Sequence, residues 1–222
     1  MNLLGAYTPQ IKRRNVFFSF HYGDIMRVNN VRNSGKFKTV LTGTGRVIEG
    51  YYDRSLWERR KLEGEESLRR LIRTGVQNTS AICVLIGSMT WQRPWVRYEI
   101  ARSVIDERGL LAIHINSLPH HQDRSIDPPG DNPCRYMGIA LSENGKYYLC
   151  ERVPVQSGSS EYKWIWYTKY THPVSVPRYM PKPVANEPIR LSDCINEYDW
   201  ILGNGSQNIG AWIDQAAQNV GR

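Results

Sequence analysis

SAICVLIGSMTWQRPWVRYEI, the stretch from residue 80 to residue 100, decides how this chain folds. Its first part, Ser80–Gly87, is a continuous apolar run, which is typical of a strand buried on both faces in a parallel sheet. From Trp95 onward, apolar residues recur at every fourth position, which predicts an amphipathic helix from Trp95 to about Glu107, ended by Gly109. A strand that leads into a helix through a short loop is the repeating unit of an α/β fold.

The segments on either side continue this alternation. Further strands are predicted at Asn15–Phe20 and Leu110–Asn116, with a short one at Thr39–Leu41 or Arg46–Ile48. Further helices are predicted from the N-cap Asp24 to Arg32, and around Glu65–Arg73 with Gly75 as the C-cap. Strands and helices that alternate with short links predict an α/β fold with a mostly parallel central sheet and helices on both faces.

The pattern changes after Asn116. Residues 117–134 are polar and proline-rich, so a long loop is predicted there. Strands are predicted at Tyr147–Val153 and Tyr162–Tyr167, an extended segment at Val174–Pro188, and helices at Asp193–Ile201 and Ile209–Val220. We therefore divide the chain into an N-terminal extension (residues 1–14), a core (15–116) and a C-terminal extension that decorates the core and packs on it (117–222).

Composition narrows the class of protein. The 222 residues, 41% of them hydrophobic, are enough for a soluble globular protein with a full core. No apolar run reaches the roughly 18 residues that a membrane helix needs. The N-terminus places its apolar residues before its basic run at Lys12–Arg14, which is the wrong order for a signal peptide. We expect a cytoplasmic protein that does not engage a membrane.

The net charge of +8 has three explanations: nucleic-acid binding, an anionic small-molecule ligand, or solubility alone. The basic residues are scattered, and those near the helix around Glu65–Arg73 alternate with acids, as on a solvated helix face. We expect no nucleic-acid partner. The four cysteines have no metal-ligand spacing, and His120 and His121 would point apart on an extended chain, so no metal site is predicted.

Ligands of open parallel sheets bind outside the carboxyl ends of the strands. The segments Phe20–Asp24 and Gly87–Arg93 and the start of the helix that carries Glu99 converge there. Trp95 and Glu99 are four residues apart, so they share one helix face. A carboxylate beside an indole could stabilise the oxocarbenium-like transition state of N-glycosidic cleavage. The alternative is that Trp95 belongs to the core and that Glu99 pairs with Arg93, Arg97 or Arg102, and spacing alone favours this alternative.

Several of these segments resemble one known family. NVFFSFHYGD at 15–24 resembles the first strand and loop of TIR domains, and the Trp95-x-x-x-Glu99 spacing is that of their catalytic motif. SLWE at 55–58, NTSAICVLIGS at 78–88 and WVRYEI at 95–100 are similar to the bacterial TIR-like proteins of the Thoeris anti-phage system. The resemblance is close over residues 15–116 and looser to about residue 202. The Gly-rich stretch at 42–50 and the basic N-terminal extension have no counterpart in it.

The resemblance implies a flavodoxin-like TIR fold and an NAD-consuming enzyme in which Glu99 is the catalytic glutamate. NAD would be the substrate and not a bound cofactor. Residues near the substrate would be Phe18, Phe20, His21, Tyr22, Trp57, Ser88 and Trp95.

The implied product is a cyclic ADP-ribose isomer that activates a separate effector protein, with a phage component as the trigger and self-association as a route to activation. Two rival functions remain open: a non-enzymatic TIR interaction module, and another N-glycosidase or base-exchange enzyme acting on nucleotides.

Overall fold

The structure is a computed structural model. It describes residues 14–34, 37–38, 46–49, 64–120, 122, 124–156, 158–185 and 187–222. For β2 (Phe37–Lys38) and β3 (Arg46–Glu49) it gives the backbone course only. Among the described residues, no helix is long and apolar enough to cross a membrane.

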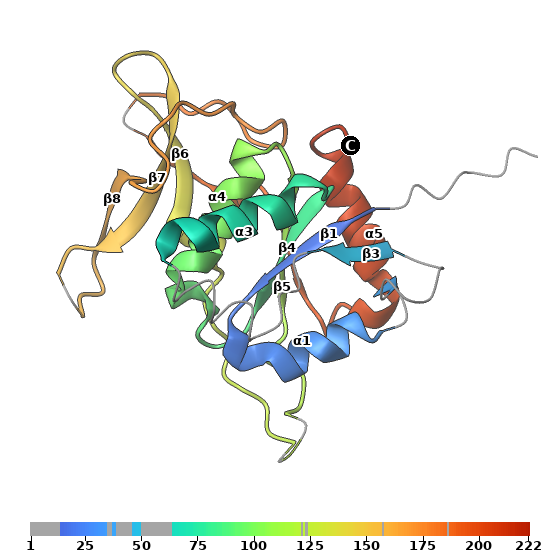
Figure 1. The fold of residues 1–222 in the computed structure, drawn as a ribbon. Coiled ribbons are helices and arrows are strands. Elements are labelled where there is room, and N and C mark those ends of the chain that lie inside the picture. The colour runs from blue at the N-terminus through green and yellow to red at the C-terminus, as the bar shows by residue number, and fades with distance from the viewer. Residues whose placement is uncertain are drawn as a thin grey trace, which may run out of the picture.

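A parallel sheet forms the centre of the molecule (Figure 1). Its well-buried strands are β1 (Val16–Phe20), β4 (Ala81–Ile86) and β5 (Gly109–His114), flanked by β10 (Asn196–Asp199) on one side and by β3 and β2 on the other. In the strand order β10-β5-β4-β1-β3-β2, the strands that follow β1 in the chain lie first on one side of it (β2 and β3) and then on the other (β4, β5 and β10). The switch point of the sheet therefore lies between β1 and β4. A crevice at the carboxyl ends of these two strands is the usual ligand position in such sheets.

Helices cover both faces of this sheet. On one face, α3 (Glu65–Gln77) and α4 (Pro94–Ile105) pack on Phe17, Ile82 and Val84. On the other face, α1 (Ile25–Arg32) and α5 (Gly205–Gln218) pack on Val16, Phe18 and Cys83. Successive strand residues alternate between the two clusters because side chains of a strand point alternately to opposite faces. The predicted α/β fold with a parallel central sheet is confirmed.

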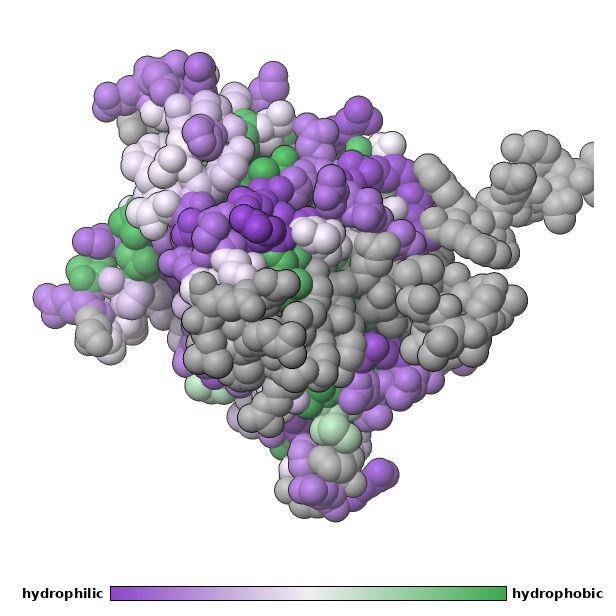
Figure 2. Space-filling view, viewed as in Figure 1, coloured by the Kyte–Doolittle hydropathy of each residue, from purple (hydrophilic) through white to green (hydrophobic). Residues whose placement is uncertain are grey.

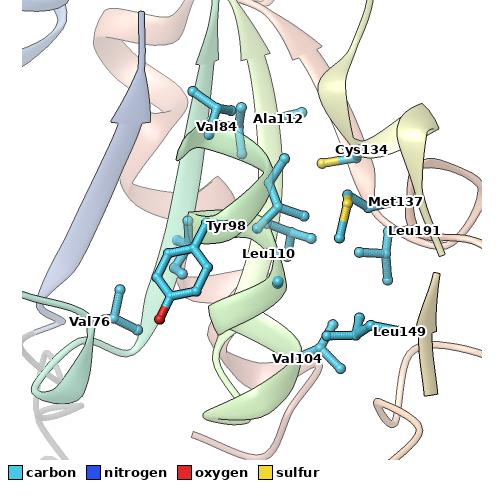
Figure 3. Close-up of a cluster of buried hydrophobic side chains, with 14 of the residues drawn as sticks. Val76, Val84, Tyr98, Val104, Leu110, Ala112, Cys134, Met137, Leu149 and Leu191 are labelled. Atoms are coloured by element: carbon cyan, nitrogen blue, oxygen red, sulfur yellow. The ribbon is translucent and has the colours of Figure 1, made fainter. Parts of the chain in front are cut away.

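A second, antiparallel sheet lies on the side of α3 and α4, away from α5 (Figure 1). Its strands are β6 (Met137–Leu141), β7 (Tyr147–Pro154), β8 (Tyr162–Trp166) and β9 (Ile189–Arg190), in the order β8-β7-β6-β9. Met137 and Leu149 join the same buried cluster as Val104 and Leu110, so this sheet shares a core with the parallel one (Figure 3). The strands predicted at Tyr147–Val153 and Tyr162–Tyr167 are confirmed as β7 and β8, and they pair in antiparallel.

Single-turn 3-10 helices complete the fold. They are η1 (Tyr22–Asp24), η2 (Thr90–Gln92), η3 (Pro133–Tyr136) and η4 (Leu191–Asp193). The first two follow β1 and β4 directly, so they stand at the edge of the sheet where a ligand is expected.

Two of the predicted helix ends are wrong. Gly75 does not end its helix: α3 continues through it to Gln77, with Asn78 as C-cap, and Gly75 is buried against the core. Gly109 does not end a helix but begins β5. A Cβ at Gly109 would lie 2.3 Å from the carbonyl oxygen of Ala216, so glycine there permits the close approach of α5.

The predicted helix at Asp193–Ile201 is also wrong, because β10 occupies the middle of this range and pairs in parallel with β5. Its sequence, NEYD, has weak strand propensity, and tertiary contacts decide its conformation. Tyr198 stacks on Trp212 of α5 at a centroid distance of 4.2 Å, and Glu197 bonds His114 at 2.7 Å. Residues 117–222 were predicted as an extension that packs on the core. They also supply β10 to the parallel sheet and α5 to the helices that cover it.

The short strand β3 agrees with the predicted alternative at Arg46–Ile48, whereas Thr39–Leu41 lies outside the described residues. Strand β6 was not predicted. The exposed face over α3 is hydrophilic (Figure 2), and its arginines pair with acids of the same helix, with Arg69 bonding Glu65 and Arg73 bonding Glu66. This is the solvated helix face that the charge pattern indicated.

Candidate active site

Glu99 lies on α4 with its carboxyl group turned toward the end of β1. The residue is 6% exposed, and one of its oxygens, Oε2, accepts a hydrogen bond of 2.6 Å from the hydroxyl of Ser19. Ser19 is the penultimate residue of β1 and pairs with Val84 of β4, so the two side chains meet beside the switch point of the sheet. The strand alternation explains this contact, because Ser19 shares the α4 face of β1 with Phe17.

Burial raises the pKa of Glu99 to about 8, while the hydrogen bond from Ser19 acts in the opposite direction. The predicted alternative, in which an arginine neutralises Glu99, is wrong for the described residues. Arg97 pairs instead with Glu151 at 3.4 Å, and Arg102 with Asp106. Glu99 is therefore a buried carboxyl group held by one neutral donor, and a cation placed beside it would favour its charged form.

Trp95, one turn before Glu99, packs against the apolar cluster under α3 and α4. Its ring meets that of Tyr98 edge to face at 5.8 Å, and the ammonium group of Lys169 lies 4.6 Å from its centroid. Lys169 also pairs with Glu65 of α3 at 3.6 Å. These contacts agree with the alternative in which Trp95 is a core residue, and they fix the first turn of α4 against α3 and the segment that follows β8.

The loops after β1 and β4 are tied together by Asp24. Its buried carboxylate accepts a hydrogen bond of 3.4 Å from the hydroxyl of Thr90, which in turn accepts the backbone N–H of Gly87 at 2.9 Å. A Cβ at Gly87 would stand 2.2 Å from this carboxylate, so only glycine leaves room for it. Burial raises the pKa of Asp24, and Arg27, 3.8 Å away, opposes the shift. The network fixes the two loops that follow β1 and β4, at the edge of the sheet where a ligand is expected.

Comparison with known proteins shows the family of this chain. Residues 17–120 match the family described as "Thoeris protein ThsB, TIR-like domain". A relative from Bacillus cereus (strain MSX-D12), named "Putative cyclic ADP-D-ribose synthase ThsB1", is 37% identical over 204 residues, which cover 90% of this chain and 99% of the relative.

The chain belongs to the Thoeris ThsB family of TIR-like proteins. The matched segment of this ThsB-family chain runs from β1 past β5, so it contains both Ser19 and Glu99. The resemblance noted from the sequence motifs is thereby confirmed.

The other predicted site residues of this ThsB-family protein fall into groups. His21, Tyr22 and Ser88 lie on the loops that follow β1 and β4, at the expected edge of the sheet. Tyr22 is 40% exposed, whereas His21 is partly buried. Burial, with Arg93 nearby, lowers the pKa of His21.

Phe18 and Phe20 belong to the cluster under α1 and α5, on the opposite face of β1 from Glu99. The structure does not bring these two rings to the carboxyl group. They hold the strand that presents Ser19. Trp57 lies outside the described residues.

Three residues at this site were not predicted from the sequence: Ser19, Thr90, and Asp24 as the residue that ties the two loops together. A signal for Ser19 was present, because it is the polar residue within the otherwise apolar VFFSF strand. A lone hydroxyl in a buried strand needs a partner, and here the partner is Glu99. Asp24 was expected to cap a helix, and it does occupy the N-cap position of α1, but its side chain makes no capping hydrogen bond.

Proposed function

We propose that this chain cleaves the nicotinamide N-glycosidic bond of NAD and closes the ADP-ribose part into a cyclic product, in the Thoeris defence against phage. The observation that carries the proposal is the buried, unneutralised carboxyl group of Glu99, held by Ser19 at the carboxyl ends of β1 and β4. Membership of the ThsB family and the name of the Bacillus cereus relative support it. We take the architecture to be the flavodoxin-like TIR fold, since β3, β1, β4, β5 and β10 follow the order 2-1-3-4-5.

Glu99 acts on the ribose of the nicotinamide nucleoside. The pyridinium ring of NAD is cationic, so its arrival beside Glu99 favours the ionised carboxylate despite burial. The carboxylate then stabilises positive charge at C1′ as the bond to the ring breaks. Nicotinamide leaves as a neutral molecule, and therefore no acid is needed to protonate it. A nucleophile on the adenosine part of the same molecule then attacks C1′, and NAD is a substrate throughout.

The hydroxyl of Ser19 orients Glu99 through its hydrogen bond. His21, Tyr22 and Ser88 would contact the substrate from the two loops, and Trp57 remains a prediction from the family resemblance. The cyclic product passes to a separate effector protein. A phage component or self-association would switch the enzyme on, and we propose a cytoplasmic location for this signalling.

The test is product analysis in cells that carry the full chain with and without Glu99→Gln, sampled during phage infection. We expect mass spectrometry to find nicotinamide release and a cyclic ADP-ribose isomer with the native chain, and neither with Glu99→Gln. The matched control is Glu143→Gln, since Glu143 is an exposed glutamate on the β6–β7 turn.

Three outcomes would contradict the proposal. Unchanged product formation by Glu99→Gln would exclude Glu99 as the catalytic residue. Linear ADP-ribose or an exchanged base as the product of the native chain would point to the rival N-glycosidase. If no NAD is consumed and a partner protein still binds Glu99→Gln, the chain is an interaction module.

A further inference from the structure

A second cleft opens at the same edge of the parallel sheet, beyond the ends of β5 and β10. It encloses about 560 Å³. Its polar lining includes Asn116, Asp127 and Asp199, and an apolar wall is formed by Ile126, Pro128 and Pro129. Neither Glu99 nor Ser19 is among the residues that line it, so it is distinct from the candidate active site.

Asn116 supplies the first sign that the cleft takes a ligand. The residue is 6% exposed, and its Nδ2 donates to the carbonyl oxygen of Asp127 at 3.1 Å. Its Oδ1 has no hydrogen-bond partner within the described part of the chain. A buried acceptor without a hydrogen-bond donor is unfavourable and uncommon in folded proteins. We therefore expect this oxygen to accept a hydrogen bond from an N–H or O–H group of a ligand.

The charge of the cleft is the second sign. Asp199, which lines the cleft, uses Oδ1 to accept the backbone N–H groups of Ile201 and Leu202, both at 2.8 Å, and its second carboxylate oxygen takes no part in these two bonds. Asp127 adds a second carboxylate, paired with Arg27 at 2.8 Å. Negative charge is thus gathered beside an apolar wall, in a chain whose net charge is +8.

Acceptors, negative charge and an apolar wall together suit one class of ligand. We propose that the cleft binds an organic cation, namely a guanidinium or primary ammonium group on a short apolar stem. The head group donates to Asn116 Oδ1 and to the carboxylate of Asp199, and the stem packs on Ile126 and the two prolines. Charge-assisted hydrogen bonds are the strong ones, and the apolar wall excludes water around them.

The cleft is connected to the loop after β1 by ion pairs. Arg27 Nη1 lies 2.8 Å from Asp127 and 3.8 Å from Asp24, and Asp24 Oδ2 lies 4.0 Å from the ring of His21. Asn116 donates to the carbonyl oxygen of Asp127, so a cation bound at Asn116 Oδ1 would disturb Asp127 and its ion pair with Arg27, and its binding should also be felt at His21. This connection gives the cleft a physical route to the loop that the proposed catalysis uses.

The test is binding of n-butylguanidinium to the full chain, followed by ¹H–¹⁵N NMR. We expect the side-chain amide signals of Asn116 and the backbone signal of His21 to shift on titration. n-Butylurea has nearly the same shape and N–H donors but no charge, and it should bind about tenfold more weakly. A Gly-Arg-Gly tripeptide that binds more tightly than the free cation would identify the source as a protein side chain; weaker binding would identify a small molecule.

The matched variants are Asp199→Asn and Asp193→Asn. Asparagine at position 199 keeps the oxygen that accepts from Ile201 and Leu202 but removes the charge, so we expect about tenfold weaker binding. Asp193 is exposed on η4 and does not line the cleft, so its variant should bind like the native chain. If Asp199→Asn does not fold, Ile126→Ser on the 64% exposed wall residue serves instead, with weaker binding expected through the stem.

Equal binding of the cation and the urea, or an Asn116 amide signal that does not move, would overturn the proposal. So would an Asp199→Asn variant that folds and binds the cation like the native chain. None of these measurements uses NAD turnover, and their failure would leave the proposed enzymatic function intact.

Discussion

Replacing Glu99 with glutamine should stabilise the folded chain at neutral pH. Burial raises the pKa of Glu99 from 4.5 to about 8, so the folded state holds its proton more tightly than the unfolded state does. The stability associated with the protonated group is fully present below pH 4.5 and is lost as the pH rises toward 8. Glutamine has nearly the same shape, keeps an oxygen for the Ser19 hydroxyl, and carries no charge at any of these pH values.

The size of the effect follows from the two pKa values. Relative to a neutral side chain, the ionisable Glu99 destabilises the fold by about 1 kcal/mol at pH 5, about 3 kcal/mol at pH 7 and about 4 kcal/mol at pH 8. Between pH 4.5 and pH 8 the carboxyl group is ionised in the unfolded chain and protonated in the folded one. Over this interval each pH unit therefore adds about 1.4 kcal/mol to the destabilisation. The variant should gain these amounts.

Urea unfolding of the native chain, Glu99→Gln and Glu143→Gln at pH 5, 7 and 8 measures the gain. The free energy of unfolding of Glu99→Gln should exceed that of the native chain by an amount that grows with pH. Glu143 is exposed, so its variant should follow the native chain at all three pH values. A difference between Glu99→Gln and the native chain that stays constant from pH 5 to pH 8 would refute the reasoning, because it would mean that burial does not hold the proton on Glu99.

Three further predictions concern catalysis and the rim of the site. In pH–rate measurements on NAD, kcat/KM should rise with pH toward an apparent pKa of about 8, since the free enzyme must ionise Glu99; a flat profile contradicts this. Ser19→Ala should raise that apparent pKa and lower kcat/KM by about tenfold, whereas Ser103→Ala, whose hydroxyl bonds within α4, should leave the profile in place. Gly87→Ala should lower the free energy of unfolding in urea by a few kcal/mol, because its Cβ would stand 2.2 Å from the Asp24 carboxylate. Adding Asp24→Ala should recover part of that loss, and strictly additive effects of the two substitutions would exclude the clash.

Elements with a strong local pattern could be predicted from the sequence. The run Ser80–Gly87 became β4, and the four-residue spacing after Trp95 became α4. Both patterns arise because burial on two faces demands a continuous apolar strand, and burial on one face demands a periodic helix. The position of Glu99 at the edge of the sheet followed from these two elements alone.

Elements whose conformation depends on distant partners could not be predicted. Asn196–Asp199 is a strand because it completes the edge of β5 and because Tyr198 stacks on Trp212. The contact between Ser19 and Glu99 joins residues 80 positions apart, and no spacing rule within one element contains it. The resemblance to TIR domains predicted Glu99 as the catalytic glutamate, but it predicted no hydrogen-bond partner for Glu99.

The two buried carboxyl groups beside the switch point differ in their partners, and this difference separates their roles. Asp24 has Arg27 at 3.8 Å and the hydroxyl of Thr90 at 3.4 Å, and its bulk fills the space that Gly87 leaves, so its partners already lie within the fold. Glu99 has one neutral donor and no cation within ion-pair distance among the described residues. Burying this carboxyl group costs several kcal/mol of folding free energy. It brings no structural benefit over glutamine, because a glutamine side chain would accept the hydrogen bond from Ser19 equally well. The missing partner of Glu99 is a positive charge, and in the proposed reaction the sugar cation formed as nicotinamide departs would supply it.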